Sequence, residues 1–226
     1  MKGEILCIET RGLLFDMDGV LISSTGSVER CWKRWCKHYG LANAESFQVP
    51  HGTRAIDIMR MLKQEWDEAQ IAEGLRTIED MEIEDVGDLR VLPGAKELLQ
   101  GLPPECWAIV TSATRRLLLG RLAAAGLPVP ERLISGDMVK RGKPDPEPYR
   151  RGAELLGLAP RECLVVEDAP SGVGAGRAAG CRVLGVLGTH AMSELQEATW
   201  IVGSLKDFAV RIAGDGLELR FVDVTG

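Results

Sequence analysis

The chain has 226 residues, of which 45% are hydrophobic and 27% charged, which is typical of one globular domain or of one domain with a smaller insertion. Its net charge of −6 argues against sequence-independent binding to nucleic acid, which depends on clustered Lys and Arg. No signal peptide, membrane-spanning stretch or C-x-x-C pair is found, so we expect a cytoplasmic protein that does not enter membranes.

Apolar runs that alternate with helical patterns predict buried β-strands. The predicted strands are residues 13–15, 107–110, 133–134, 164–166 and 183–187. The predicted helices between and after them are residues 95–100, 114–125, 146–156 and 170–179. Continuous apolar strands separated by helices indicate a parallel sheet covered on both faces. We therefore predict an open, Rossmann-like α/β core, whose sites lie beyond the carboxyl ends of the strands. Two further runs, residues 4–9 and 217–224, are expected to pair at a sheet edge.

The segment after the first core strand does not follow this alternation of strands and helices. Apolar and aromatic side chains recur at helical spacing from Val28 to Tyr39, which predicts an amphipathic helix. Between residues 65 and 88, ten acidic residues stand against one basic residue, which we interpret as a solvated outer helix face. The predicted domains are an α/β core of residues 1–20 and 90–226 and an all-helical cap of residues 21–89.

Two carboxylates separated by one residue end the first core strand. Asp16 and Asp18 are followed by Gly19, in the pattern D-x-D-G. Like charges this close repel one another, and the sequence offers no obvious partner for either, so a purely structural role is costly. An Asp-rich turn closed by a glycine is the structural alternative, and it would be the default for this pattern alone.

Polar groups also end three later core segments. Ser112 and the backbone N–H groups near Ala113 lead into a helix, where a phosphate oxygen can bind, although most such sequences only cap the helix. Lys143 lies in a loop stiffened by prolines, and its structural alternative is a solvated surface lysine. Glu167 and Asp168 follow an apolar strand and supply the hard oxygen ligands that Mg²⁺ prefers.

Taken together, these elements resemble the haloacid dehalogenase-like superfamily. Its four motifs are matched in order by Asp16 and Asp18, by Ser112, by Lys143, and by Glu167 and Asp168. The resemblance covers essentially the whole chain. Residues 142–149 and 167–172 look like the branch of sugar- and polyol-phosphate phosphatases, which includes 2-deoxyglucose-6-phosphate and glycerol-phosphate phosphatases and is kin to β-phosphoglucomutase. A single D-x-D-G is a weak signal, whereas four ordered elements are a specific one.

The resemblance implies a Mg²⁺-dependent phosphatase. In that case Asp16 is the nucleophile that forms an aspartyl-phosphate, and Asp18 is the general acid and base. The implied metal ligands are Asp16, the backbone carbonyl of Asp18, and Asp168, with Glu167 in support. The implied phosphate-binding residues are Ser112, Ala113 and Lys143. Dehalogenases and phosphonate-cleaving members lack an aspartate at the position of Asp18, which disfavours both chemistries here.

Substrate selection is expected to come from the cap, because the core binds only the phosphoryl group that all substrates share. The cap segment His51-Gly52-Thr53-Arg54 also resembles the sugar-phosphate phosphatases. We therefore predict that His51 and Arg54 contact the remainder of the substrate. The alternative for Arg54 is that it only begins the following helix and faces water.

Three functions remain open from the sequence. The first is a phosphatase acting on small sugar or polyol phosphates, and the second is a β-phosphoglucomutase-like hexose-phosphate mutase. The third is a non-catalytic binding protein, which the intact motif residues disfavour. We expect Mg²⁺ as the cofactor, a small phosphorylated metabolite as the partner, no nucleic acid, and a monomer or weak dimer.

Overall fold

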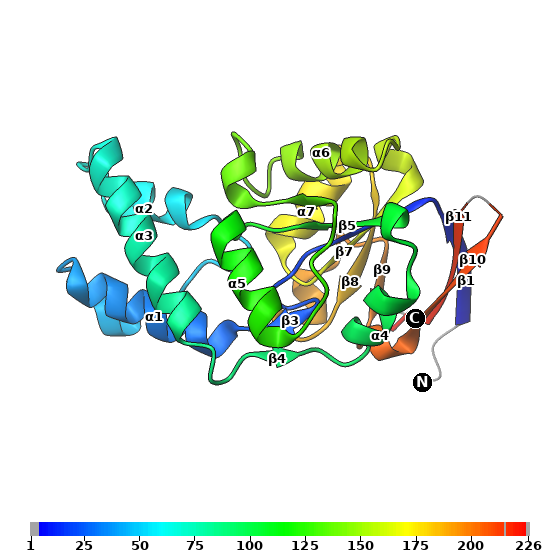
Figure 1. Cartoon of the computed structure of the whole chain (residues 1–226), viewed down its shortest axis with the longest axis horizontal. Helices are drawn as coiled ribbons and strands as arrows, with labels where there is room; N and C mark the ends of the chain where they lie inside the picture. Colours follow the sequence, from blue (N-terminus) through cyan, green and yellow to red (C-terminus); the bar gives the residue numbers. More distant parts are fainter. Residues whose placement is uncertain (1–4, 215, 225–226) are drawn as a thin grey trace.

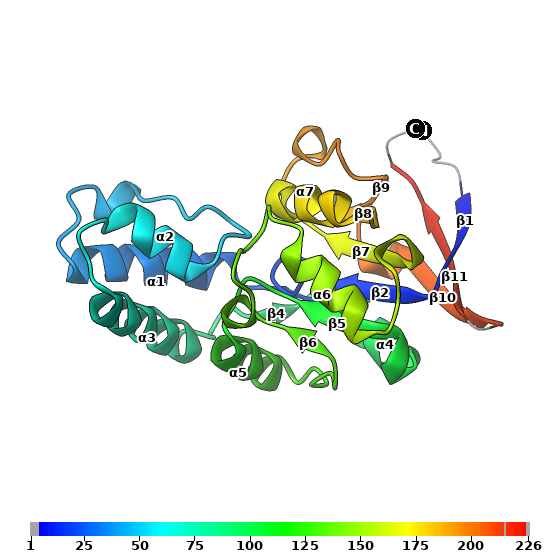
Figure 2. The same cartoon turned by 90° about the horizontal axis from the view of Figure 1, so that it is seen from above.

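The computed structural model describes residues 5–214 and 216–224. Figure 1 shows three parts in a row: the helices of the insertion, a core in which helices surround a parallel sheet, and a small antiparallel sheet. Figure 2 shows the same three parts from above. Within these described ranges, no helix combines the length and apolar character needed to cross a membrane.

A six-stranded parallel sheet forms the centre of the core, in the order β6-β5-β2-β7-β8-β9. The strands are β2 (Gly12–Phe15), β5 (Trp107–Val110), β6 (Leu133–Ile134), β7 (Cys163–Glu167), β8 (Arg182–Val186) and β9 (Trp200–Val202). The predicted parallel α/β core is therefore confirmed. The apolar runs predicted all of these strands except β9, which is only three residues long.

Helices cover both faces of this sheet. They are α4 (Ala95–Gly101), α5 (Arg115–Ala125), α6 (Glu147–Leu155) and α7 (Pro170–Ala179). Phe15 of β2 packs in the same cluster as Leu118 of α5, whereas its neighbour Leu14 packs in the cluster of Tyr149 of α6. Successive side chains of a strand point to opposite faces, so a strand covered on both faces is apolar at every position.

The insertion consists of helices that pack on their own apolar core. They are α1 (Thr25–His38), α2 (Ala55–Leu62) and α3 (Glu68–Glu84). The predicted aromatic stripe is buried, since Trp32 and Trp35 of α1 share a cluster with Met59 of α2. The chain leaves and re-enters the core through a two-stranded antiparallel ribbon, β3 (Ile22–Ser23) with β4 (Arg90–Val91). The exact division into domains remains a prediction.

A separate antiparallel sheet lies at the opposite end of the core from the cap (Figure 1). It contains β1 (Ile5–Thr10), β10 (Phe208–Ala213) and β11 (Gly216–Val222), in the order β1-β11-β10. The predicted pairing of the first and last strands is confirmed, although Glu4 lies outside the described residues. The two strands belong to a sheet of their own, with β1 at its edge, and not to the central sheet. Leu219 and Phe221 instead pack onto the main core cluster, because every second side chain of β11 is apolar.

Short 3₁₀ turns complete the fold. They are η1 (Ala44–Ser46), η2 (Pro104–Cys106), η3 (Gly136–Met138), η4 (Pro160–Glu162), η5 (Met192–Glu194) and η6 (Leu205–Asp207). The turn η3 lies in the loop that joins β6 to α6, and this loop contacts the cap. Residues of this loop line a cavity together with Arg54 of the cap and Ser112 of the core.

Candidate active site

The centre of the site is the carboxyl end of β2, which lies between β5 and β7 in the sheet. Phe15 is opposite Ile109 on one side and Val166 on the other, so the three strands end at nearly the same level. The residues that follow these strands, among them Asp16, Ser112 and Asp168, are therefore brought to one edge. All three line one cavity of about 100 Å³, which residues of the cap complete.

Lys143 is buried between two carboxylates. Its ammonium nitrogen Nζ lies 2.7 Å from Oδ1 of Asp16 and 2.6 Å from Oε1 of Glu167. The side chain is 1% exposed, which excludes the alternative of a solvated surface lysine. Burial alone would lower the pKa of Lys143, but Asp16 and Glu167 outweigh it and raise the pKa above its ordinary value. The lysine is therefore a fixed positive charge against Asp16.

Negative charge exceeds positive charge around this lysine. Three buried carboxylates, those of Asp16, Glu167 and Asp168, are close to the one ammonium of Lys143. Burial raises the pKa of Asp16 to about 7, with Lys143 opposing the rise and Glu167 adding to it. Burial, Glu167 and Asp16 raise the pKa of Asp168 well above its ordinary value. Such a site is stabilised by an additional cation.

The carboxylates fit a hard divalent metal ion such as Mg²⁺. One oxygen from each of Asp16, Glu167 and Asp168 lies within 4.8 Å of the others, and oxygen-only donors are those that Mg²⁺ prefers. Gly19 permits this approach, because a Cβ at its position would lie 1.8 Å from Oδ2 of Asp168. Its backbone φ of +83° is also one that favours glycine.

Glu167 differs from the other two carboxylates because protein donors surround it. Its Oε1 accepts from Lys143 and from the hydroxyl of Tyr149, at 2.6 and 2.9 Å. Its Oε2 accepts from the backbone N–H groups of Asp168 and Ala169, at 2.9 and 3.0 Å. These four contacts use the acceptor positions that a carboxylate offers. In this arrangement Glu167 holds the ammonium group of Lys143 and the backbone at Asp168 in place.

Ser112 and Ala113 lie where they were predicted, at the end of β5, and each already has a partner. The hydroxyl of Ser112 donates to the backbone carbonyl of Gly52 in the cap, at 2.6 Å. The N–H of Ala113 donates to Oγ1 of Thr111 at 3.1 Å. Thr114 caps α5, accepting a hydrogen bond from the N–H of Leu117.

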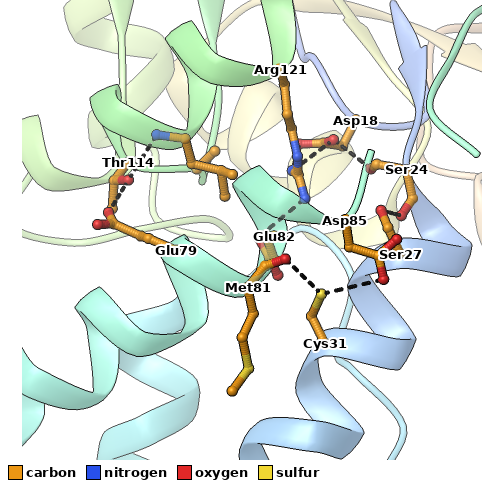
Figure 3. A network of polar contacts seen from close by, with 12 residues as sticks. Asp18, Ser24, Ser27, Cys31, Glu79, Met81, Glu82, Asp85, Thr114 and Arg121 are labelled. Atoms are coloured by element: carbon orange, nitrogen blue, oxygen red, sulfur yellow. Dashed lines mark hydrogen bonds and ion pairs between the residues drawn. The ribbon is translucent and has the colours of Figure 1, made fainter. Parts of the chain in front are cut away.

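Asp18 follows Asp16 by two residues but has a different set of partners (Figure 3). The Nη1 nitrogen of Arg121 lies 2.9 Å from each carboxylate oxygen of Asp18. Ser24 also donates its hydroxyl to Oδ1, at 2.6 Å. Arg121 belongs to α5, and its Nη2 donates to Oε2 of Glu82 on the cap helix α3, at 3.1 Å.

The expectation of a solvated acidic face is wrong for two of the cap glutamates. Glu79 and Glu82 are buried, because this side of α3 faces α5 of the core. Glu79 accepts from the hydroxyl of Thr114, and Glu82 accepts from Arg121. Burial raises the pKa of Glu82 to about 7, although the charge of Arg121 opposes the rise. Acidic residues on this helix therefore form part of the contact between cap and core.

The two predicted cap residues occupy different places. His51 lines the cavity beside Asp16 and Asp18. Arg54 is buried, but it points to the loop between β6 and α6 rather than into that cavity. Its five N–H groups are matched by five hydrogen bonds, two of them to the carboxylate of Asp57 and three to the backbone carbonyls of Gly136, Val139 and Lys140. Neither a water-facing Arg54 nor a substrate contact fits this geometry.

Arg121, Glu82 and Ser24 were missed by the motif search. A signal for Arg121 is present, because it is a single charge between leucines and alanines in the sequence L-L-L-G-R-L-A-A-A. A charge on an apolar helix face that packs on a sheet requires a partner. No comparable signal marks the other two residues. Glu82 accepts from Arg121, which is 39 residues away in sequence, and Ser24 has the composition of an ordinary helix cap.

Comparisons with known proteins agree with this geometry. Residues 10–180 match a family model described as haloacid dehalogenase-like hydrolase. The chain is 42% identical over 205 residues to hexitol phosphatase A of Escherichia coli, covering 88% of this chain and 94% of that protein. It is 32% identical over 204 residues to 2-deoxyglucose-6-phosphate phosphatase 2 of Saccharomyces cerevisiae, covering 82% of this chain and 83% of that protein. A β-phosphoglucomutase structure from Clostridium difficile shares the fold, with a TM-score of 0.73 and 19% identity over 87% of this chain and 92% of that one.

Proposed function

The chain belongs to the haloacid dehalogenase-like hydrolases and is a phosphoric monoester hydrolase, and we propose that it hydrolyses small sugar or polyol monophosphates with Mg²⁺ through an aspartyl-phosphate, an acyl phosphate formed on Asp16. The observation that carries this proposal is the buried pairing of Asp16 with Lys143, next to Asp168, at the carboxyl ends of adjacent strands. The names of the two relatives, a hexitol phosphatase and a deoxyhexose-phosphate phosphatase, support the substrate class.

In the first half-reaction, a carboxylate oxygen of Asp16 forms a bond to phosphorus as the bond from phosphorus to the substrate oxygen breaks. Asp18 gives its proton to the departing alcohol. In the second half-reaction, Asp18 takes a proton from a water molecule, which attacks the phosphorus of the aspartyl-phosphate. Inorganic phosphate leaves and the carboxylate of Asp16 is restored. The spacing of the two residues supports this division, because they share one strand end but have separate partners.

Charge stabilisation is divided among groups from several strand ends. Lys143 offsets the negative charge that the phosphoryl group brings next to Asp16. Ser112 can donate to a phosphate oxygen once it exchanges its bond to Gly52 for one to the substrate. A Mg²⁺ ion held by Asp16, Asp168 and the backbone carbonyl of Asp18 would supply further positive charge at the phosphoryl oxygens. Glu167 keeps Lys143 in place from the opposite side.

The cap wall of the cavity favours a phosphatase over the mutase alternative. A mutase that works through a bisphosphate must hold a second phosphate away from Asp16, and this requires cationic groups. The arginines at the contact between cap and core, Arg54, Arg116 and Arg121, already donate to carboxylates. The wall also carries the acidic Glu79 and Glu82. This side of the cavity suits the hydroxyl groups of a sugar or polyol better than a second phosphate.

The proposal is tested by measuring phosphate released from a panel of phosphorylated metabolites in the presence of Mg²⁺. We expect release from hexitol, deoxyhexose or glycerol phosphates and from an aryl phosphate. Hexose 1-phosphate should yield free phosphate rather than hexose 6-phosphate. Conversion to hexose 6-phosphate without release would favour the mutase, and failure with every substrate would contradict the proposal.

A further inference from the structure

The acid–base residue of the proposed function is held by a network that spans core and cap. We propose that Arg121 is a positioning residue that places Asp18 for proton transfer, and that Glu82 makes this placement depend on cap contact. The inference rests on the proposed function, in which Asp18 is the general acid and base. Figure 3 shows the three side chains pointing toward one another, from three separate segments of the chain.

Arg121 is placed where an unpaired charge would be costly. It lies on the buried side of α5 with Leu117, Leu118 and Leu122, and its side chain is 4% exposed. A guanidinium in such a place is tolerated only when carboxylates compensate for its lost hydration. Asp18 and Glu82 are these carboxylates. The pair of 2.9 Å contacts from one nitrogen also fixes the direction of the Asp18 carboxylate.

Ser24 restrains Asp18 from a second direction. It occupies the N-cap position of α1, yet its hydroxyl makes no capping bond and donates to Oδ1 of Asp18 instead. A carboxylate has about four acceptor positions, and Arg121 and Ser24 use three of them on Asp18. The remaining position is on Oδ2. We therefore assign proton transfer to Oδ2, on a carboxyl group whose orientation is set by its other three contacts.

Glu82 connects this arrangement to the cap. It belongs to α3, it is buried, and it accepts from the Nη2 of the same guanidinium that holds Asp18. A cap that withdraws from the core takes Glu82 with it and leaves Arg121 with one carboxylate instead of two. The guanidinium that orients Asp18 is therefore fixed from both sides only while α3 contacts α5. This dependence favours proton transfer when the cap covers the substrate and water is excluded.

The leaving group of the substrate distinguishes this role from a purely structural one. The aryloxide of an aryl phosphate can leave without a proton, whereas the alkoxide of a polyol phosphate needs one from Asp18. For Arg121→Met we expect kcat/KM on a polyol phosphate to fall at least about tenfold, within the range that general acid catalysis supplies. On the aryl phosphate, kcat/KM should stay within about threefold of wild type. Because Asp18 also acts as the base, a burst of aryl alcohol should precede slow turnover.

Arg116→Met is the matched control. Arg116 lies on the same helix and also bridges to α3, through Glu79 and Asp80 at 3.4 and 2.5 Å, but it does not contact Asp18. It should show neither the substrate dependence nor the burst. The inference is overturned if Arg116→Met and Arg121→Met change kcat/KM on the two substrates in the same way. It is also overturned if Arg121→Met lowers kcat/KM equally on the polyol and the aryl phosphate, because Arg121 then only holds the cap.

Arg121→Met leaves the buried Glu82 without its ionic partner, so the double variant Arg121→Met/Glu82→Gln is tested beside it. Removing the charge of Glu82 removes this cost, and the double variant should show the same substrate dependence and burst in a folded protein. If the wild type releases phosphate but the double variant loses kcat/KM equally on both substrates, the inference is overturned and the proposed function stands. If the wild type releases phosphate from neither substrate, the proposed function is overturned, and the inference with it.

Discussion

The hydroxyl of Ser112 in the core donates to the backbone carbonyl of Gly52 in the cap, at 2.6 Å, across 60 residues of sequence. The cap loop therefore occupies the group that the family motif assigns to the phosphate. Gly52 has a φ of +78°, which allows its loop to turn tightly over the core. If Ser112 binds the phosphate as proposed, substrate exchanges this contact for one of its own, and phosphate binding and the position of the cap loop then compete at Ser112.

Ser112→Ala should lower kcat/KM on an aryl phosphate by at least about tenfold, because one donor to the transferring phosphoryl group is lost. Stability should fall by only about 1 kcal/mol, the usual contribution of one hydrogen bond. Steady-state kinetics and urea unfolding measure the two effects. Ser171→Ala is the control, since Ser171 donates to the carbonyl of His51 in the same cap loop, at 3.4 Å, from outside β5. Similar kinetic losses in both variants would assign Ser112 to holding the loop alone.

Asp16→Asn should abolish turnover, with a loss of about 10⁴-fold or more, while the protein stays folded. The amide has the shape of the carboxylate but is not a nucleophile, and Lys143 keeps Glu167 as its ionic partner. Phosphate release and circular dichroism of the purified variant are the two measurements. Appreciable steady-state activity in a correctly folded Asp16→Asn protein would end the proposed mechanism.

The sequence was sufficient to predict the parts of the fold and site that depend on local pattern. Buried strands such as β5 and β7 are apolar at every position, and the polar residues that follow them lie at one edge because neighbouring parallel strands end together. This is why Asp16 and Asp168, which are 152 positions apart, could be expected in one site.

Contacts between the cap and the core could not be predicted in this way. A charged residue on a helix does not reveal which element covers it, so Glu82 was assigned to a solvated face and Arg121 went unnoticed. Arg54 illustrates the same limit. Its neighbours in sequence suggested a ligand contact, but its partners include carbonyl groups more than 80 residues away.

Activity should require Mg²⁺ and disappear with EDTA, and Mg²⁺ should also stabilise the fold. At a concentration 100 times the dissociation constant, binding adds about 2.7 kcal/mol to the free energy of unfolding. Asp168→Asn should lose this stabilisation. Without the metal it should be at least as stable as wild type, because it removes one of three buried carboxylates near a single ammonium. Thermal unfolding with and without Mg²⁺ measures both effects.

Asp80→Asn provides the control for this metal prediction, because it removes the same charge from an exposed position on α3. It should keep the wild-type response to Mg²⁺. A wild-type melting temperature that does not change with Mg²⁺, together with full activity after metal removal, would argue for a metal-free phosphatase.

Arg54→Ala should destabilise the protein and lower activity without changing substrate preference. The guanidinium joins Asp57 of α2 to three carbonyls of the loop between β6 and α6, so its loss leaves several buried acceptors without a donor. We expect a loss of about 2–3 kcal/mol in the free energy of unfolding, given that Asp57 is partly exposed. The same loop leads to Lys143, so kcat/KM should fall by a similar factor for aryl and sugar phosphates.

Arg60→Ala is the control for Arg54→Ala. It breaks an exposed ion pair with Glu68 in the cap and should lower the free energy of unfolding by no more than about 1 kcal/mol. A loss confined to the sugar phosphate, at unchanged stability, would instead return Arg54 to the substrate-binding surface.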